Sequence, residues 1–94
     1  MYDLTAFQRD LVFVIGALDE PHGLRVKDEI EKYYENEINH GRLYPNLDQL
    51  VEMGFVAKGT KDKRTNSYTL TRRGHSEIDS RLEWQAEYVD GLEV

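Results

Sequence analysis

The sequence contains no cysteine, which excludes disulfide bonds and metal sites built on thiolates. It also lacks any apolar run near the roughly 20 residues that a membrane-spanning helix needs. The opening Met-Tyr-Asp-Leu-Thr has none of the basic and then apolar layout of a signal peptide. A reducing intracellular setting is compatible with these features, and we expect a soluble, cytoplasmic protein that makes no contact with membranes.

Signatures of catalysis are missing as well. The histidines His22, His40 and His75 are too scattered for a metal-binding motif, and the sequence has no glycine-rich phosphate loop. No Gly-x-Ser-x-Gly element marks a nucleophile. The many carboxylates fall on the outward faces of the expected helices, where solvation alone would place them. We therefore predict that the protein is not an enzyme and needs no cofactor or metal.

Positive charge is scarce, because 18 acidic residues outnumber 12 basic ones and the net charge is −6. The deficit is uneven along the chain. Residues 1–55 carry a net charge of −6 and residues 74–94 carry −5, whereas residues 56–73 carry +5. A surface this acidic keeps a protein soluble where salt screens charge strongly, so the composition fits a salt-loving host. The short basic segment is the part of the sequence that would attract a polyanion.

What the sequence does contain is a succession of periodic segments that predicts one domain, residues 1–94, mainly α with a small β-hairpin. Helices are expected at about 5–18, 24–35, 40–53 and 72–89, and the hairpin at about 55–70. Thr5 and Gln8 have the spacing of a capping box, and Thr71 is the expected N-cap of the last helix. Gly54 suits the end of the third helix, and residues 36–39 are expected to form a short polar connection.

Two helices joined by a short turn and followed at once by a hairpin form a winged helix-turn-helix, a plan that suits the major groove of DNA. The opening turns of the third helix carry polar residues on the faces that its leucines leave free. The residues expected to contact DNA from this helix are His40, Gly41, Arg42, Tyr44, Asn46 and Gln49. Arginine can donate twice to guanine, and asparagine or glutamine can pair with adenine, so Arg42, Asn46 and Gln49 are the candidates for reading bases.

The hairpin provides the second expected contact with DNA. Its basic residues can neutralise phosphates and release counterions, and its polar residues can donate to the DNA backbone. The candidates are Lys58, Lys61, Lys63, Arg64, Thr65 and Asn66. Arg72 and Arg73 open the last helix, where cations oppose the helix dipole, so a phosphate partner would account for their position.

Four short motifs stand out in this arrangement. They are Ala-Leu-Asp-Glu-Pro-His-Gly at 17–23, Gly-Arg-Leu-Tyr-Pro-Asn-Leu-Asp-Gln-Leu at 41–50, Gly-Phe-Val at 54–56 and Tyr-Thr-Leu-Thr-Arg-Arg-Gly at 68–74. Together they resemble the PadR family of winged-helix transcription regulators, and the resemblance covers essentially the whole chain. Leu24 departs from the family pattern, because an aromatic residue is usual there. The acidic composition is similar to what a salt-adapted archaeal member would have.

The resemblance implies a homodimer in which the C-terminal helix crosses to the partner and packs near its first helix. The interface would then contain Leu4, Phe7, Leu11, Ile78, Leu82, Trp84, Tyr88 and Val89. So small a chain buries little core alone, which favours a partner, although the last helix could also pack on its own subunit. Some family members bind phenolic acids or planar drugs near this interface. Trp84 could stack on such a small-molecule effector or serve as interface packing.

Motifs and charge pattern together predict a sequence-specific DNA-binding transcription regulator, with repression by operator occlusion as its default mechanism. The alternative is a winged-helix module that binds protein rather than DNA, since the overall negative charge would repel a duplex. The basic hairpin region distinguishes the two, because a module that binds only protein has no need of a local charge of +5.

Overall fold

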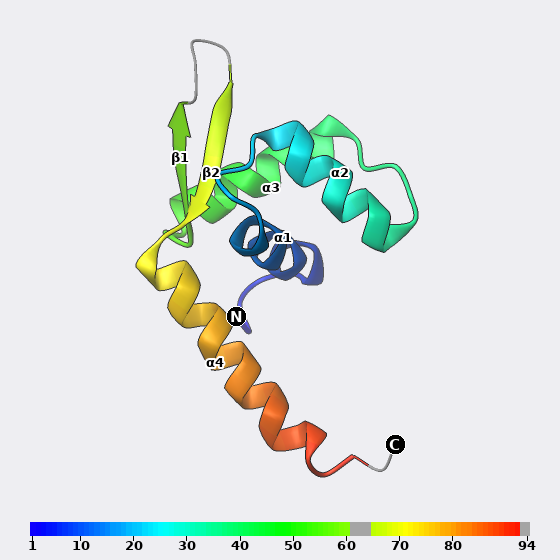
Figure 1. Cartoon of the computed structure of the whole chain (residues 1–94), viewed down its shortest axis with the longest axis vertical. Helices are drawn as coiled ribbons and strands as arrows, with labels where there is room; N and C mark the ends of the chain where they lie inside the picture. The colour runs from blue at the N-terminus through cyan, green and yellow to red at the C-terminus, as the bar shows by residue number, and fades with distance from the viewer. Residues whose placement is uncertain (61–64, 93–94) are drawn as a thin grey trace.

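The computed structural model describes residues 1–60 and 65–92. Its elements follow in the order α1 (Ala6–Ala17), α2 (Gly23–Tyr34), α3 (His40–Glu52), β1 (Val56–Thr60), β2 (Asn66–Leu70) and α4 (Arg72–Val89). Figure 1 shows α1, α2 and α3 packed together, with the hairpin projecting from one side and α4 running away on the other. This arrangement confirms the winged helix-turn-helix expected from the sequence. Within the described ranges, no helix is long and apolar enough to cross a membrane.

α1 and α4 begin at the threonines that the sequence marks as caps. Thr5 Oγ1 accepts from the backbone N–H of Gln8 at 3.1 Å, and Gln8 Oε1 accepts in return from the N–H of Thr5 at 3.1 Å. Thr71 Oγ1 accepts from the N–H of Gly74 at 3.0 Å. Each bond satisfies a donor that has no partner inside its own helix, so both helix starts are stabilised locally.

The start of α2 is tied to the hairpin. His22 is the N-cap, and its Nδ1 accepts from the N–H of Arg25 at 3.1 Å. Just before it, the Pro21 carbonyl accepts from the N–H of Tyr68 at 2.9 Å, and His22 forms an isolated antiparallel bridge with Ser67. The sequence predicted only a helix break here. The structure shows that this backbone hydrogen bond and this isolated bridge fix the hairpin beside the start of α2.

α3 is capped at both ends, and only the cap at Gly54 was predicted from the sequence. Asn39 Oδ1 accepts from the N–H of Arg42 at 2.8 Å, and Pro45 lies inside the helix. Gly54 follows the helix with a φ of 84°, in the left-handed region that glycine adopts most easily, which confirms the predicted cap. The chain then enters the antiparallel hairpin, in which Val56 of β1 lies opposite Leu70 of β2.

The core lies between α1, α2, α3 and the base of the hairpin. Its buried apolar residues are Leu4, Phe7, Leu11, Val12, Ile15, Val26, Ile30, Ile38, Leu43, Leu47, Leu50, Phe55, Val56 and Tyr68. Ile38 corrects one expectation, because it lies in the connection that was predicted to be polar and yet is only 1% exposed. Its backbone N–H donates to Glu31 Oε2 at 2.7 Å, so the connection folds back onto α2 and its single apolar side chain enters the core.

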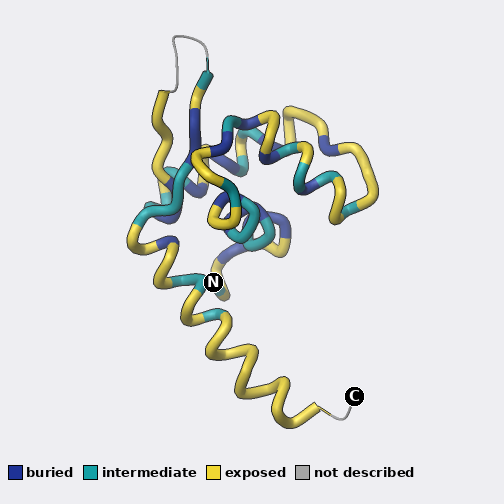
Figure 2. Tube along the Cα trace, in the orientation of Figure 1, coloured by how far each residue is buried: buried dark blue, intermediate teal, exposed yellow. Residues whose placement is uncertain are grey.

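The residues that the family resemblance assigned to a dimer interface fall into two groups. Leu4, Phe7 and Leu11 lie in the core of the subunit itself, because α1 packs that stripe against its own neighbours, and they have almost no surface to offer a partner. Ile78 is partly buried against the same core. Beyond it α4 leaves the body, and Figure 2 shows it exposed along most of its length. Its exposed apolar side chains are Leu82, Trp84, Tyr88 and Val89.

Candidate nucleic-acid interface

The three candidates for reading bases lie in one row along α3. Their spacing, i, i+4 and i+7, places Arg42, Asn46 and Gln49 on a common face, beside the buried leucines. In this structure the row faces α1. Arg42 and Gln49 remain exposed to solvent and Asn46 is partly exposed, so the row lies at the edge of the surface.

Arg42 stacks on aromatic rings of the neighbouring helices. Its guanidinium carbon lies 4.0 Å from the ring centroid of Phe7 and 5.7 Å from that of Tyr34. Tyr34 is held in turn by its hydroxyl, which donates to Asp10 Oδ2 at 2.8 Å. Burial and this hydrogen bond raise the pKa of Tyr34 to about 12. The rings therefore give the guanidinium a fixed platform while its donor edge stays accessible.

Asn46 and Gln49 are joined to α1 through Gln8. Gln8 Nε2 donates to Asn46 Oδ1 at 3.1 Å and to Gln49 Oε1 at 2.7 Å. Gln8 is only 5% exposed, and sequence analysis assigned it no role beyond the capping box. The signal that could have found it is its spacing of four and seven residues from Val12 and Ile15, which places a polar amide on a buried stripe of α1.

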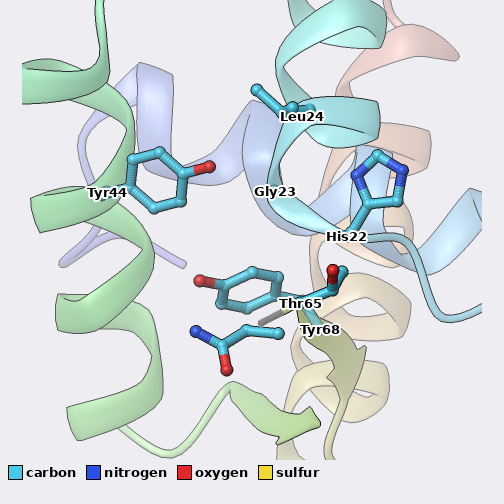
Figure 3. A pocket seen from close by; sticks show the side chains of 7 residues that line it. His22, Gly23, Leu24, Tyr44, Thr65 and Tyr68 are labelled. Atoms are coloured by element: carbon cyan, nitrogen blue, oxygen red, sulfur yellow. The ribbon is translucent and has the colours of Figure 1, made fainter. Parts of the chain in front are cut away.

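A cavity of about 310 Å³ opens between the start of α2, α3 and the hairpin. We call it the wing pocket; it is lined by His22, Gly23, Leu24, Tyr44, Thr65, Asn66 and Tyr68. Figure 3 shows Tyr44 reaching from α3 toward the first residues of α2. A Cβ on Gly23 would lie 2.6 Å from the Tyr44 hydroxyl oxygen, so glycine is required for this close approach. Within this pocket the sequence had singled out Tyr44, Thr65 and Asn66 as candidate contacts with DNA.

The described part of the hairpin adds one cation to this region. Lys58 Nζ lies 3.7 Å from Asp48 Oδ1 of α3, and both side chains are largely exposed. Thr65 is partly exposed, and Asn66 is exposed at the start of β2. Lys61, Lys63 and Arg64 lie outside the described residues.

The remaining candidates occupy the ends of helices. His40 and Gly41 are exposed in the first turn of α3, and the His40 ring meets Tyr44 edge to face at 5.5 Å. Arg72 is exposed in the first turn of α4. Arg73 Nη1 donates to the Met53 carbonyl at 3.0 Å, and its guanidinium carbon lies 4.6 Å from the Phe55 ring centroid. Arg73 therefore compensates the negative end of α3, which explains a basic residue in the first turn of α4, where it opposes that helix's own dipole.

Comparison with known proteins decides the family. Residues 12–80 match the family described as Transcriptional regulator PadR-like family. This chain belongs to the PadR family. Its relatives regulate transcription and are not enzymes, which agrees with the absence of catalytic motifs in the sequence. No curated protein matches the chain.

The chain is similar in sequence and structure to solved structures of RosR, an archaeal PadR-family regulator. The structure of H. salinarum RosR has 50% sequence identity and a TM-score of 0.87, over 92% of this chain and 77% of that one. A RosR structure described as the hsRosR-S1 complex has 49% identity and a TM-score of 0.89, over 93% of this chain and 77% of that one. Bacillus subtilis PadR in complex with operator DNA shares the fold, with 18% identity and a TM-score of 0.70, over 95% and 61% of the two chains.

Proposed function

We propose that this PadR-family regulator is a homodimeric, sequence-specific DNA-binding repressor that acts by occupying its operator. The observation that carries the proposal is the row of Arg42, Asn46 and Gln49, which lies at the edge of the exposed surface of α3, next to α1. Arg42 and Gln49 can donate to base edges in the major groove, whereas both ends of the Asn46 amide already bond within the protein. Support also comes from the relatives, since Bacillus subtilis PadR and Streptococcus pneumoniae FabT were both crystallised with DNA.

Charge along α3 favours entry into the groove by its N-terminal half. Asp48 and Glu52 lie in the C-terminal half, where their carboxylates would repel phosphates. His40, Gly41 and Arg42 lie at the opposite end, where the helix dipole favours anions. Arg42 on its aromatic platform would then be the foremost base-reading residue, and Gln49, about two turns further along the helix, would reach a more distant base pair.

The wing pocket would hold a backbone phosphate. It combines the N-terminus of α2 with the hydroxyl of Tyr44 and the side-chain amide of Asn66, which are donors without positive charge. Such contacts fix the orientation of a protein on the duplex and carry no sequence information. Lys58 and the basic residues of the hairpin would add the charge that binds further phosphates.

The experiment that tests the function is selection of bound sequences from random duplexes at several salt concentrations. We expect an enriched, roughly palindromic site with half-sites about one helical turn apart, as a symmetric dimer requires. A host of high salinity calls for measurements up to about 1 M salt, where the Debye length falls to roughly 3 Å. Absence of duplex binding at every salt concentration would instead favour the protein-binding alternative.

A pair of triple variants tests the role assigned to the hairpin. Lys61→Ala, Lys63→Ala and Arg64→Ala together should weaken binding to all DNA sequences. The slope of the logarithm of the binding constant against the logarithm of the salt concentration should fall by the equivalent of up to about three phosphate contacts. Arg25→Ala, Lys27→Ala and Lys32→Ala on α2 remove the same residue types and charge, and their ion pairs are with Glu29 and Glu31. Equal losses in the two variants would mean that net charge, rather than the hairpin, determines affinity.

A further inference from the structure

The side-chain amide of Gln8 has only one orientation that its surroundings accept. Its Oε1 must face the N–H of Thr5, because that backbone group can donate and cannot accept. Its Nε2 therefore points toward α3 with two hydrogens, and it finds two acceptors there, Asn46 Oδ1 and Gln49 Oε1. The cap of α1 thus sets the direction of the hydrogen bonds that reach α3.

The orientation of the Gln8 amide also sets the orientation of the Asn46 and Gln49 amides on α3. Asn46 has its oxygen on Gln8, and its Nδ2 donates to the Arg42 carbonyl at 2.7 Å. Both ends of that amide are thereby engaged within the protein. Gln49 also has its oxygen on Gln8, but no residue in the described part of the chain accepts from its Nε2. The NH2 group of Gln49 is therefore the end available to a ligand on the exposed side of α3.

We propose that Gln8 is a positioning residue for base recognition, which fixes Gln49 so that its NH2 group and not its oxygen is presented to DNA. This inference rests on the proposed function. In the major groove an NH2 donor selects an acceptor, which guanine provides at O6 and N7, adenine at N7 and thymine at O4. Cytosine provides only its N4 donor there, so it is excluded at this position.

Reversal of the Gln49 amide is disfavoured by the buried side of the network. A reversed Gln49 would point its NH2 at the NH2 of Gln8, and a nearly buried donor would lose its acceptor. An unsupported glutamine can offer either end to a base, or both ends to adenine. Gln8 removes that choice. Although Gln8 itself would not contact DNA, it would therefore help to determine which base is preferred at the position contacted by Gln49.

Gln8→Glu reverses the direction of the network and provides the main test. One carboxylate oxygen can still accept from Thr5, while the other accepts from the NH2 group of Gln49, whose oxygen then turns outward. Asn46 keeps its Nδ2 on the Arg42 carbonyl and only loses its bond from position 8. In selections from random duplexes, the parent should prefer guanine, adenine or thymine at one position of each half-site. Gln8→Glu should enrich cytosine, the base that the parent excludes, at that position by on the order of tenfold, and leave the other positions unchanged.

The matched control is Asn36→Asp, which makes the same change from amide to carboxylate at an exposed position between α2 and α3 and keeps the bond from the Glu37 N–H. It should lower affinity slightly at all sites and leave every base preference unchanged. Gln8→Met, of similar length without polar atoms, should broaden the preference at the Gln49 position only. Thermal unfolding of each variant separates these effects from loss of the fold, because simple destabilisation lowers affinity without changing the preferred base at one position.

Gln49→Glu tests the inference without touching the cap of α1. One of its oxygens can accept from Gln8 while the other faces DNA, so cytosine should again be enriched at this position. Identical preferences in the parent, Gln8→Glu and Gln49→Glu would overturn the role of Gln8 while leaving DNA binding established. Failure of the parent to bind any duplex would overturn the proposed function itself.

Discussion

Gly74, in the first turn of α4, lies directly against the backbone carbonyl of Phe55 at the entrance to the hairpin, and a Cβ on this glycine would overlap that oxygen. The same carbonyl accepts from the N–H of Thr71 at 3.1 Å, so it cannot move away without loss of a bond. This contact brings α4 close to β1 and fixes the direction in which the helix leaves the body (Figure 1).

Gly74→Ala should therefore destabilise the protein, by about 1–3 kcal/mol, because an added methyl group meets backbone and not a flexible side chain. The control is Gly41→Ala in α3, where a Cβ meets only Asn39 Oδ1 at 3.4 Å. That change should stabilise the helix by up to about 1 kcal/mol, since alanine loses less backbone entropy than glycine. Chemical denaturation of both variants checks the prediction, and a neutral effect of Gly74→Ala would contradict the contact.

Arg73→Ala should cost stability as well as DNA affinity. The variant loses the bond to the Met53 carbonyl and the contact with the Phe55 ring, together worth about 1 kcal/mol at an exposed site. Its neighbour Arg72, exposed in the same turn, provides the control. Arg72→Ala should change the free energy of unfolding by less than about 0.5 kcal/mol. If both variants unfold at the same denaturant concentration, Arg73 does not stabilise the end of α3.

Local signals in the sequence were sufficient to predict the order of elements. The capping box of Thr5 and Gln8, the cap at Thr71 and the glycine after α3 all depend on residues a few positions apart, and the structure has each of them. Capping hydrogen bonds between residues so close in the chain depend only on residue type and spacing. The helix starts could therefore be recognised without a structure.

The contacts of the candidate interface could not be predicted in the same way. Gln8 reaches Asn46 across 38 positions, and Arg73 finds the carbonyl of Met53 across 20. From the sequence, these arginines and side-chain amides were all expected to be free to bind DNA. A helical pattern shows which face of a helix is exposed, but it does not show which neighbouring residue contacts the edge of that face. The wing pocket depends equally on tertiary packing, since Gly23 and Tyr44 approach only when α2 lies on α3.

Tyr34 predicts a specific dependence of stability on alkaline pH. Burial and the bond to Asp10 raise its pKa to about 12, above the usual value of 10.0. A group whose pKa is raised by folding stabilises the native state below its unfolded pKa and loses this effect as the pH rises through the folded pKa. The contribution of Tyr34 should therefore be complete below about pH 10 and decline between about pH 10 and 12.

Tyr34→Phe should remove that part of the decline and lower the stability at neutral pH, because Asp10 loses its donor. Tyr33→Phe is the control, since it removes a hydroxyl from the adjacent, 75% exposed tyrosine. The measurement is the free energy of unfolding at steps from pH 8 to 12. A Tyr34→Phe curve parallel to that of the parent would show that the hydroxyl does not titrate in the range expected.

α4 has a row of apolar side chains that the subunit does not bury, and a second copy of the chain would cover them in the proposed dimer. Trp84 is 50% exposed and packs against the tilted ring of Tyr88 at 4.9 Å between ring centroids. The guanidinium carbon of Arg81 lies 4.7 Å from the Trp84 ring centroid. Such a large aromatic, held in place by its own helix, is the type of residue that dominates the energy of protein interfaces.

Trp84→Ala should weaken dimerisation by at least about 2 kcal/mol, or about thirtyfold in the dissociation constant, and leave unfolding of the isolated subunit nearly unchanged. Tyr33→Ala removes a more exposed aromatic from α2 and should leave the dimer intact. Sedimentation over a range of protein concentrations distinguishes the two variants. Because each subunit would read one half-site, Trp84→Ala should also make binding to a palindromic duplex steeply dependent on protein concentration. An unchanged dimer would mean that α4 packs in some other way and that the half-site spacing has another origin.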